Sequence, residues 1–129
     1  MSWPAVLAAF VVSHLVGDFL LKTEWQALTK ARGLGEAEGR RAIGLHSLTY
    51  MLAFVPALVW IGNDTSAGRA IAVAALVAVP HVLLDDGRFV GGWMRQVKHA
   101  SDPARWLTVA VDQSFHVVCL LGAALVAAS

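Results

Sequence analysis

Four long apolar runs limit the folds that are open to this 129-residue chain. A helix of about 20 apolar residues spans the ~30 Å hydrocarbon core of a bilayer. Only helices and closed barrels satisfy their backbone hydrogen bonds in lipid. The sequence therefore predicts an all-α fold, an integral membrane bundle of four transmembrane helices in a single domain over residues 1–129. The helices are expected at about residues 3–21, 43–62, 70–85 and 106–128.

The composition agrees with a membrane environment. Hydrophobic residues make up 57% of the chain and charged residues 15%, with a mean hydropathy of +0.63, whereas soluble domains average about 25% charged residues. The net charge is only +1, so the basic excess of a nucleic-acid-binding domain is absent. We therefore expect the lipid bilayer as the main partner and no nucleic acid. The single cysteine, Cys119, excludes a disulfide within one chain.

The loops give the expected orientation. Thr23 and Gln26 form a Thr-x-x-Gln capping box, which predicts a short interfacial helix after the first run. Residues 33–41 are rich in glycine and charge, and we expect them to form a flexible loop. Basic residues gather in the first and third loops: Lys22, Lys30, Arg32, Arg40, Arg41, and Arg88, Arg95, Lys98, Arg105. By the positive-inside rule, these loops are cytoplasmic and both termini lie outside a bacterial inner membrane.

Ionisable residues recur inside these apolar runs at a fixed spacing. His and Asp are four residues apart in three runs, and the remaining run carries one histidine. The seven positions are His14, Asp18, His46, His81, Asp85, Asp112 and His116. All lie toward the predicted cytoplasmic ends of their runs, so they can meet at one depth.

The order of each pair follows the direction of its helix. The two inward-running helices carry His-x-x-x-Asp, and the outward-running fourth helix carries Asp-x-x-x-His. At a rise of 1.5 Å per residue, the imidazoles lie about 6 Å deeper than the carboxylates. The pattern predicts one shared site with a deeper imidazole layer and a shallower carboxylate layer.

A divalent cation would offset the cost of burying these groups. One charged residue at mid-bilayer costs about 2.5–3.5 kcal/mol on the insertion scale. Neutral imidazole and carboxylate are ligands for zinc, which we expect, and for iron or manganese, which remain alternatives. All seven positions are candidate metal ligands, with His14, His81 and His116 as the favoured ones. Asp18, Asp85 and Asp112 are additional ligands, groups that orient a histidine, or candidate catalytic groups. Seven ligands leave a two-metal site open, with ions about 3.5–4 Å apart.

Simpler roles compete with metal binding at individual positions. A single membrane histidine such as His46 is often a hydrogen-bonded packing residue, and Asp18 and Asp85 lie near the predicted helix ends, where interfacial residues occur. Asp86 lies about 100° around the helix from Asp85, and we expect it to be solvated. Tyr50 either donates a hydrogen bond to the site or satisfies a backbone group.

Four blocks of the sequence point to a family. They are His14-Leu-Val-Gly-Asp18-Phe-Leu-Leu-Lys22 with Trp25 and Lys30, His46-Ser47, His81-x-x-x-Asp85, and Asp112-Gln113-x-x-His116. Together they resemble a small bacterial and phage integral-membrane family of unknown function, over nearly the whole chain. Lys22 stands where that pattern has glutamine, and Asp86-Gly-Arg88 is less typical. The resemblance implies a multi-helix membrane protein and no particular reaction. A thinner likeness, to inner-membrane metal-dependent hydrolases, rests on His/Asp motifs in short hydrophobic helices.

Several functions fit this pattern. The first is a metal-dependent hydrolase acting on a lipid-linked or membrane-embedded substrate, because bound zinc supplies hydroxide at neutral pH. A proton or metal-ion transporter or channel subunit is the alternative, although the outer halves of the helices lack ionisable residues other than Cys119. A metal-dependent oxidase, a haem-binding protein and a purely structural role stay open. Four short helices form a small bundle, so a homo-oligomer is also expected.

Overall fold

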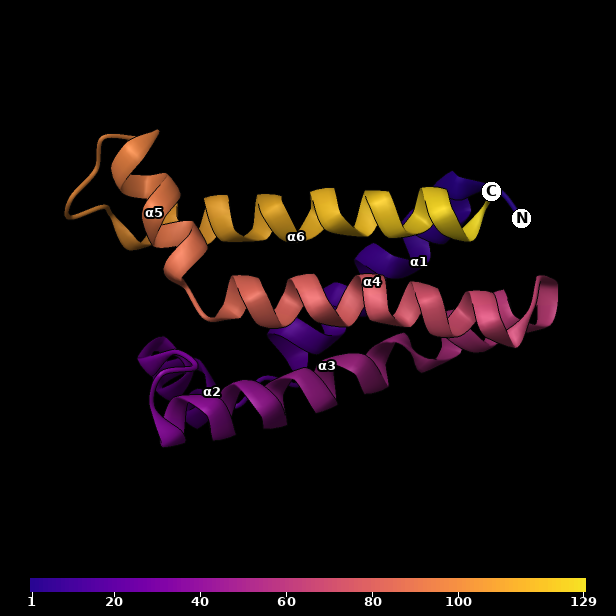
Figure 1. Cartoon of the computed structure of the whole chain (residues 1–129), viewed down its shortest axis with the longest axis horizontal. Coiled ribbons are helices and arrows are strands. Elements are labelled where there is room, and N and C mark those ends of the chain that lie inside the picture. Colours follow the sequence, from indigo (N-terminus) through magenta and orange to yellow (C-terminus); the bar gives the residue numbers. More distant parts are fainter.

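The computed structural model describes all residues, 1–129, and consists of helices without any strand (Figure 1). This confirms the predicted all-α class. In chain order the elements are α1 (Trp3–Leu15), the π-helical turn η1 (Val16–Leu20), α2 (Glu24–Thr29), the 3₁₀ turn η2 (Lys30–Arg32), α3 (Ala37–Asp64), α4 (Ala67–Asp85), α5 (Arg88–Gln96) and α6 (Arg105–Ala127).

Four helical segments are long and apolar enough to cross a membrane: α1 with η1, α3, α4 and α6. They form a closed ring of neighbours, because α1 packs against α3 and α6, and α4 packs against the same two helices. Both termini lie at one end of the bundle, and the short helices α2 and α5 lie at the other (Figure 1). The chain is a multi-pass membrane protein by this length and composition.

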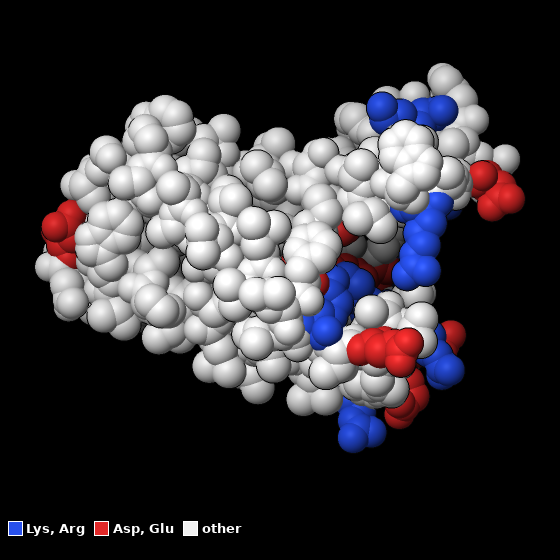
Figure 2. Space-filling model, turned by 180° about the vertical axis from the view of Figure 1, so that it is seen from behind, with Lys and Arg blue, Asp and Glu red and all other residues white.

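An apolar core fills the half of the bundle near the termini. Its twelve buried residues come from all four long helices: Val6, Phe10, Tyr50, Phe54, Ala57, Ile61, Val73, Val77, Leu120, Ala123, Ala124 and Ala127. Large apolar side chains such as Val12, Leu52 and Ile71 point outward instead and are more than half exposed. Figure 2 shows the result as a wide belt without charge, with most charged side chains gathered at one end. Such a belt suits the hydrocarbon core of a bilayer.

The segment expected as a flexible loop is partly helical. Helix α3 begins at Ala37, inside the predicted loop 33–41. Arg40 donates hydrogen bonds to the main-chain oxygens of Leu34 and Gly35 at 3.0 and 3.2 Å, which orders the turn before the helix. The prediction that Asp86 is solvated was wrong, because its carboxylate accepts a hydrogen bond from the Leu34 main-chain N–H at 2.6 Å. A buried polar contact therefore holds this segment against the end of α4.

Two short helices close the charged end. Thr23 and Gln26 form the predicted capping box at the start of α2, where each side chain bonds the other residue's backbone N–H. Helix α5 buries Val90 and Met94 in a small apolar cluster. Phe89 and Trp93 of α5 pack edge-on against Phe115 of α6. The aromatic contacts hold α5 against α6, and α2 packs against α3.

Candidate metal centre

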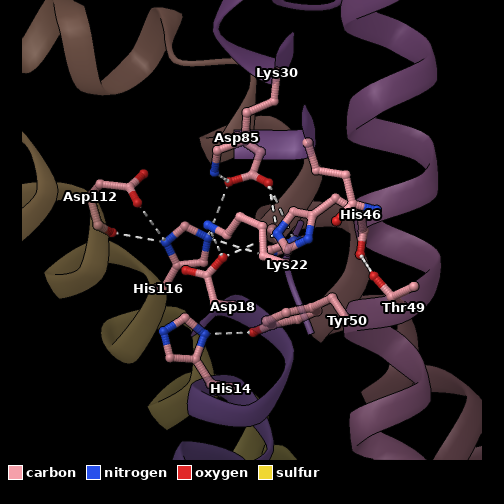
Figure 3. A network of polar contacts seen from close by, with 12 residues as sticks. His14, Asp18, Lys22, Lys30, His46, Thr49, Tyr50, Asp85, Asp112 and His116 are labelled. Carbon is pink, nitrogen blue, oxygen red and sulfur yellow. Dashed lines mark hydrogen bonds and ion pairs between the residues drawn. The ribbon is translucent and has the colours of Figure 1, made fainter. Parts of the chain in front are cut away.

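The structure brings all seven His and Asp residues of the sequence pattern into one cluster. The members are His14 on α1, Asp18 on η1, His46 on α3, His81 and Asp85 on α4, and Asp112 and His116 on α6. Six of them are buried, and the Asp112 side chain keeps 21% of its surface exposed. We refer to these seven residues as the His/Asp cluster (Figure 3).

The carboxylates of the cluster face a cavity, and the imidazoles lie behind them. The cavity has a volume of about 620 Å³ and is lined by Asp18, Asp85 and Asp112 but by none of the histidines. Figure 3 shows Asp85 and Asp112 on one side of the cluster and His14 on the other. This is the order that the reversed His/Asp motifs predict.

A chain of hydrogen bonds assigns the protons on two histidines. The main-chain oxygen of Asp112 can only accept, so His116 Nδ1 donates to it, at 2.9 Å. In a neutral imidazole the other nitrogen then accepts, so His81 Nδ1–H donates a hydrogen bond to His116 Nε2 across 3.1 Å. His81 is therefore left with a bare lone pair on Nε2.

That lone pair of His81 points at a second acceptor. Its Nε2 lies 3.5 Å from Oδ2 of Asp85, and neither atom has a hydrogen-bond partner although both are buried. Two buried acceptors that face each other are costly, because each has lost its water without gaining a donor. A cation between them would satisfy both.

Two groups of ligands could hold a metal ion. In the first, His46, His81 and Asp85 each offer one atom, and these atoms lie within 4.8 Å of one another. Asp85, Asp112 and His116 form the second group by the same criterion, so Asp85 belongs to both. The first group is the better fit, because both nitrogens of His116 already have hydrogen-bond partners.

His46 lies between two carboxylates. Its Nε2 is 3.4 Å from Oδ2 of Asp85 and 3.1 Å from Oδ1 of Asp18, so the two groups compete for this nitrogen. His46 Nδ1 is buried without a hydrogen-bond partner. It can carry the proton of the neutral imidazole if Nε2 coordinates a metal. Asp18 therefore holds His46 in place while no metal is bound, and metal binding at Nε2 would replace this hydrogen bond.

His14 is held by hydrogen bonds on both sides of its ring. Gln113 Nε2 donates to Asp18 across 2.6 Å, which leaves Gln113 Oε1 to accept from His14 Nε2 at 2.7 Å. His14 Nδ1 must then accept from the Tyr50 hydroxyl, 3.0 Å away. A metal at His14 would have to displace one of these partners, and His14 belongs to neither group of convergent ligands.

The first His/Asp pair, His14 and Asp18, is not in direct contact along its helix, unlike the other two pairs. His81–Asp85 and Asp112–His116 approach within 3.5 and 3.7 Å along their own helices. Asp18 instead lies in the π-helical turn η1, where the Leu21 N–H bonds Val16 O five residues back. The wider turn rotates Asp18 away from His14, and Gln113 bridges the two. Such π turns occur frequently at functional sites.

Close packing explains the glycine in that turn. A Cβ atom on Gly17 would lie 2.8 Å from Cδ2 and 3.0 Å from the Cα of Tyr50. The absence of a side chain lets η1 approach α3 and so brings Tyr50 to His14. The Tyr50 ring also stacks on His81, with centroids 3.6 Å apart and an interplanar angle of 7°. Tyr50 therefore fixes two imidazoles of the cluster.

Two lysines from the loop side complete the charge balance, and the sequence pattern did not identify them. Lys22 Nζ lies 2.6 Å from Oδ1 of Asp18, and Lys30 Nζ lies 2.7 Å from Oδ1 of Asp85. Burial alone would lower the pKa of Lys30, but the Asp85 carboxylate together with those of Asp18 and Asp112 outweighs burial and raises the pKa above its usual range. The Lys30 ammonium group therefore stays charged at neutral pH. Its bond to Oδ1 leaves Oδ2 of Asp85 to face His81.

Gln113 is a further site residue that was not among the candidates, because a neutral amide gives no signal in a search for ionisable groups. It contacts His14, Asp18 and, at 3.2 Å, Asp112. Its place beside Asp112 in the Asp-Gln-x-x-His block was the one clue to its role.

Comparison with known proteins places the chain in a family. The model of the family described as "Protein of unknown function (DUF3307)" matches residues 6–129. Searches of curated proteins and of solved structures gave no match. The predicted resemblance to a family of unknown function is confirmed, and no likeness to hydrolases is found. With the match extending over nearly its whole length, the chain belongs to the DUF3307 family.

Proposed function

We propose that this protein is a membrane-embedded, metal-dependent hydrolase that acts on a lipid-linked substrate. The observation that carries the proposal is the pair of buried, unpartnered acceptors, His81 Nε2 and Asp85 Oδ2, 3.5 Å apart beside His46. Few arrangements other than a cation or an added proton satisfy two such atoms at once.

Zinc is the ion that this ligand set favours. Two imidazoles and one carboxylate resemble the His₂Glu set of catalytic zinc sites, in which a fourth position stays open for water. Iron and manganese accept the same ligands and are the alternatives. The Glu-x-x-His spacing of di-iron bundles is absent from the sequence, which weighs against an oxidase.

The remaining carboxylates suit different tasks. A bound zinc ion lowers the pKa of its water to about 7 and so supplies hydroxide. Asp112 is the candidate general base, because it lines the cavity, keeps partial exposure and receives only a 3.2 Å hydrogen bond from Gln113. Asp18 has partners on both oxygens, namely Lys22 and His46 on Oδ1 and Gln113 on Oδ2, so it holds the site together.

Transport fits the structure less well than hydrolysis. The cavity lies on the carboxylate side of the cluster, and the twelve-residue apolar core fills the half of the bundle near the termini. A through-path for ions needs polar groups along its length. Haem binding also fits poorly, because His46, His81 and His116 pack with neighbouring ring centroids 5.1 Å apart, which leaves no room for a porphyrin between them.

The position of the cavity favours a membrane substrate. It lies at the charged end of the bundle, where Figure 2 shows a hollow containing acidic and basic side chains. This end carries the basic loops, so by the positive-inside rule we place it on the cytoplasmic side of the membrane. A substrate that reaches the hollow from the lipid presents its head group to the carboxylates.

An activity measurement tests the hydrolase directly. Purified protein in detergent is incubated with a total membrane-lipid extract, and water-soluble products are quantified by mass spectrometry. Wild type is expected to release product and to lose this activity with a chelator and in Asp112→Asn, whereas Asp102→Asn, a change at an exposed loop carboxylate, retains it. Product release that is unaffected by Asp112→Asn and by the chelator would refute the proposal.

A further inference from the structure

The cavity beside the His/Asp cluster is lined by three cationic groups that are not candidate metal ligands. Lys22, Lys30 and Arg105 all line it. The lysine side chains are only 15% and 18% exposed, so both ammonium groups are held inside the cavity wall. Arg105 is exposed at the start of α6 and forms no ion pair. Three cations therefore border one space, together with the carboxylates of Asp18, Glu24, Asp85 and Asp112, and Arg105 is the cation without a carboxylate partner.

The two ammonium groups have hydrogen-bonding capacity left over. Each has three N–H donors and contacts only one carboxylate oxygen, Lys22 that of Asp18 and Lys30 that of Asp85. A largely buried donor without an acceptor is unfavourable. The lysines can hold their carboxylates and donate to a ligand in the cavity at the same time.

Apolar side chains form another part of the same wall. Phe19, Val90 and Val109 line the cavity, and Phe19 and Val109 are also 54% and 45% exposed. Phe19 and Val109 therefore also belong to the outward-facing apolar surface of η1 and α6, the surface that we expect to face lipid. A ligand that enters here meets hydrocarbon on one side and cations on the other.

We propose that this cavity binds the phosphate group of a membrane amphiphile. The inference rests on the proposed function, because it names the substrate class for the same site. A phosphate monoester carries up to two negative charges and several acceptor oxygens. These suit the planar guanidinium fork of the unpaired Arg105 and the remaining N–H donors of Lys22 and Lys30, whose charges Asp18 and Asp85 already balance. A peptide bond is neutral and would use none of these charges. The phosphorus of the amphiphile then lies next to the carboxylate layer.

Equilibrium binding to the detergent-purified protein tests this inference. Titration calorimetry compares a short-chain phosphatidic acid, the matching phosphatidylcholine and glycerol phosphate. We expect phosphatidic acid to bind at least about tenfold more tightly than the other two, and Arg105→Gln to weaken its binding about tenfold, the effect of one charged hydrogen bond. Arg95→Gln removes the same charge from α5 outside the cavity and is expected to leave binding unchanged.

Each contrary result has a clear meaning. Equal affinity for phosphatidic acid and phosphatidylcholine, or equal weakening by the two arginine variants, would overturn the phosphate subsite. If glycerol phosphate binds as tightly as phosphatidic acid, the ligand need not be a membrane amphiphile, and that part of the proposal is refuted. The metal content of the same samples keeps this test separate from the proposed function. If the protein holds metal but does not bind phosphatidic acid, the phosphate subsite is refuted and the proposed metal centre is not.

Discussion

His81 and Asp85, one helical turn apart on α4, point two hydrogen-bond acceptors at each other across 3.5 Å in the buried interior of the bundle. The proton positions follow from the chain that runs from Asp112 through His116 to His81. A cation or a second proton on His81 would relieve the contact. The metal interpretation is the one that also explains why His46 converges on the same carboxylate oxygen, at 3.4 Å.

Gln113 links the two halves of the cluster, so its loss is expected to loosen both. The substitution Gln113→Leu leaves His14 Nε2 and Asp18 Oδ2 without their partners. We expect it to lower the free energy of unfolding by about 3 kcal/mol, because each unpaired buried group costs about 1–3 kcal/mol. Thermal unfolding in detergent measures the effect, and Ser114→Ala, at an exposed neighbour, is the control. A Gln113→Leu protein as stable as that control would contradict the bridging role.

Lys30 neutralises Asp85, and metal is expected to take over part of that role when the lysine is removed. Lys30→Gln breaks a largely buried ion pair, which costs about 3 kcal/mol. A cation at Oδ2 offsets the loss, so zinc should raise the unfolding temperature of Lys30→Gln more than that of wild type. Lys98→Gln, in an exposed loop, should respond like wild type. An equal response to zinc in all three proteins would separate Lys30 from the site.

Gly17 allows the close contact between η1 and α3. The Cβ atom of Gly17→Ala would meet the backbone and ring of Tyr50, and overpacking of this kind costs about 2 kcal/mol. Gly44→Ala places a methyl group in open space on α3 and should be neutral or slightly stabilising. Unfolding temperatures of the two variants compare these effects. If Gly17→Ala were as stable as Gly44→Ala, the approach of Tyr50 would not depend on this glycine.

Hydropathy and residue spacing predict the spans and the members of the cluster. The four apolar runs correspond to four long helices, and the seven ionisable residues inside them meet in one place. This works because burying ionisable groups in lipid is costly, so they are few and share a site. The reversal of the His/Asp order in the fourth run even predicts which layer faces the cavity.

The details that depend on tertiary contacts could not be predicted. The π turn at Val16–Leu20 follows from packing against Tyr50, which hydropathy does not describe. Helix α3 extends into a polar segment because Arg40 and Asp86 bond the preceding loop. The lysines of the basic loops signal orientation by their number, but their return toward Asp18 and Asp85 is a property of the folded chain.

Metal analysis of detergent-purified protein tests the central claim most directly. Wild type and His99→Ala, a change at a loop histidine outside the cluster, are expected to hold about one divalent ion per chain, as a single His₂-carboxylate site requires. The double variant His81→Ala/Asp85→Asn should hold almost none, and zinc should no longer raise its unfolding temperature. If wild type and the double variant hold equally little metal, and zinc stabilises neither, the metal centre proposed here is contradicted.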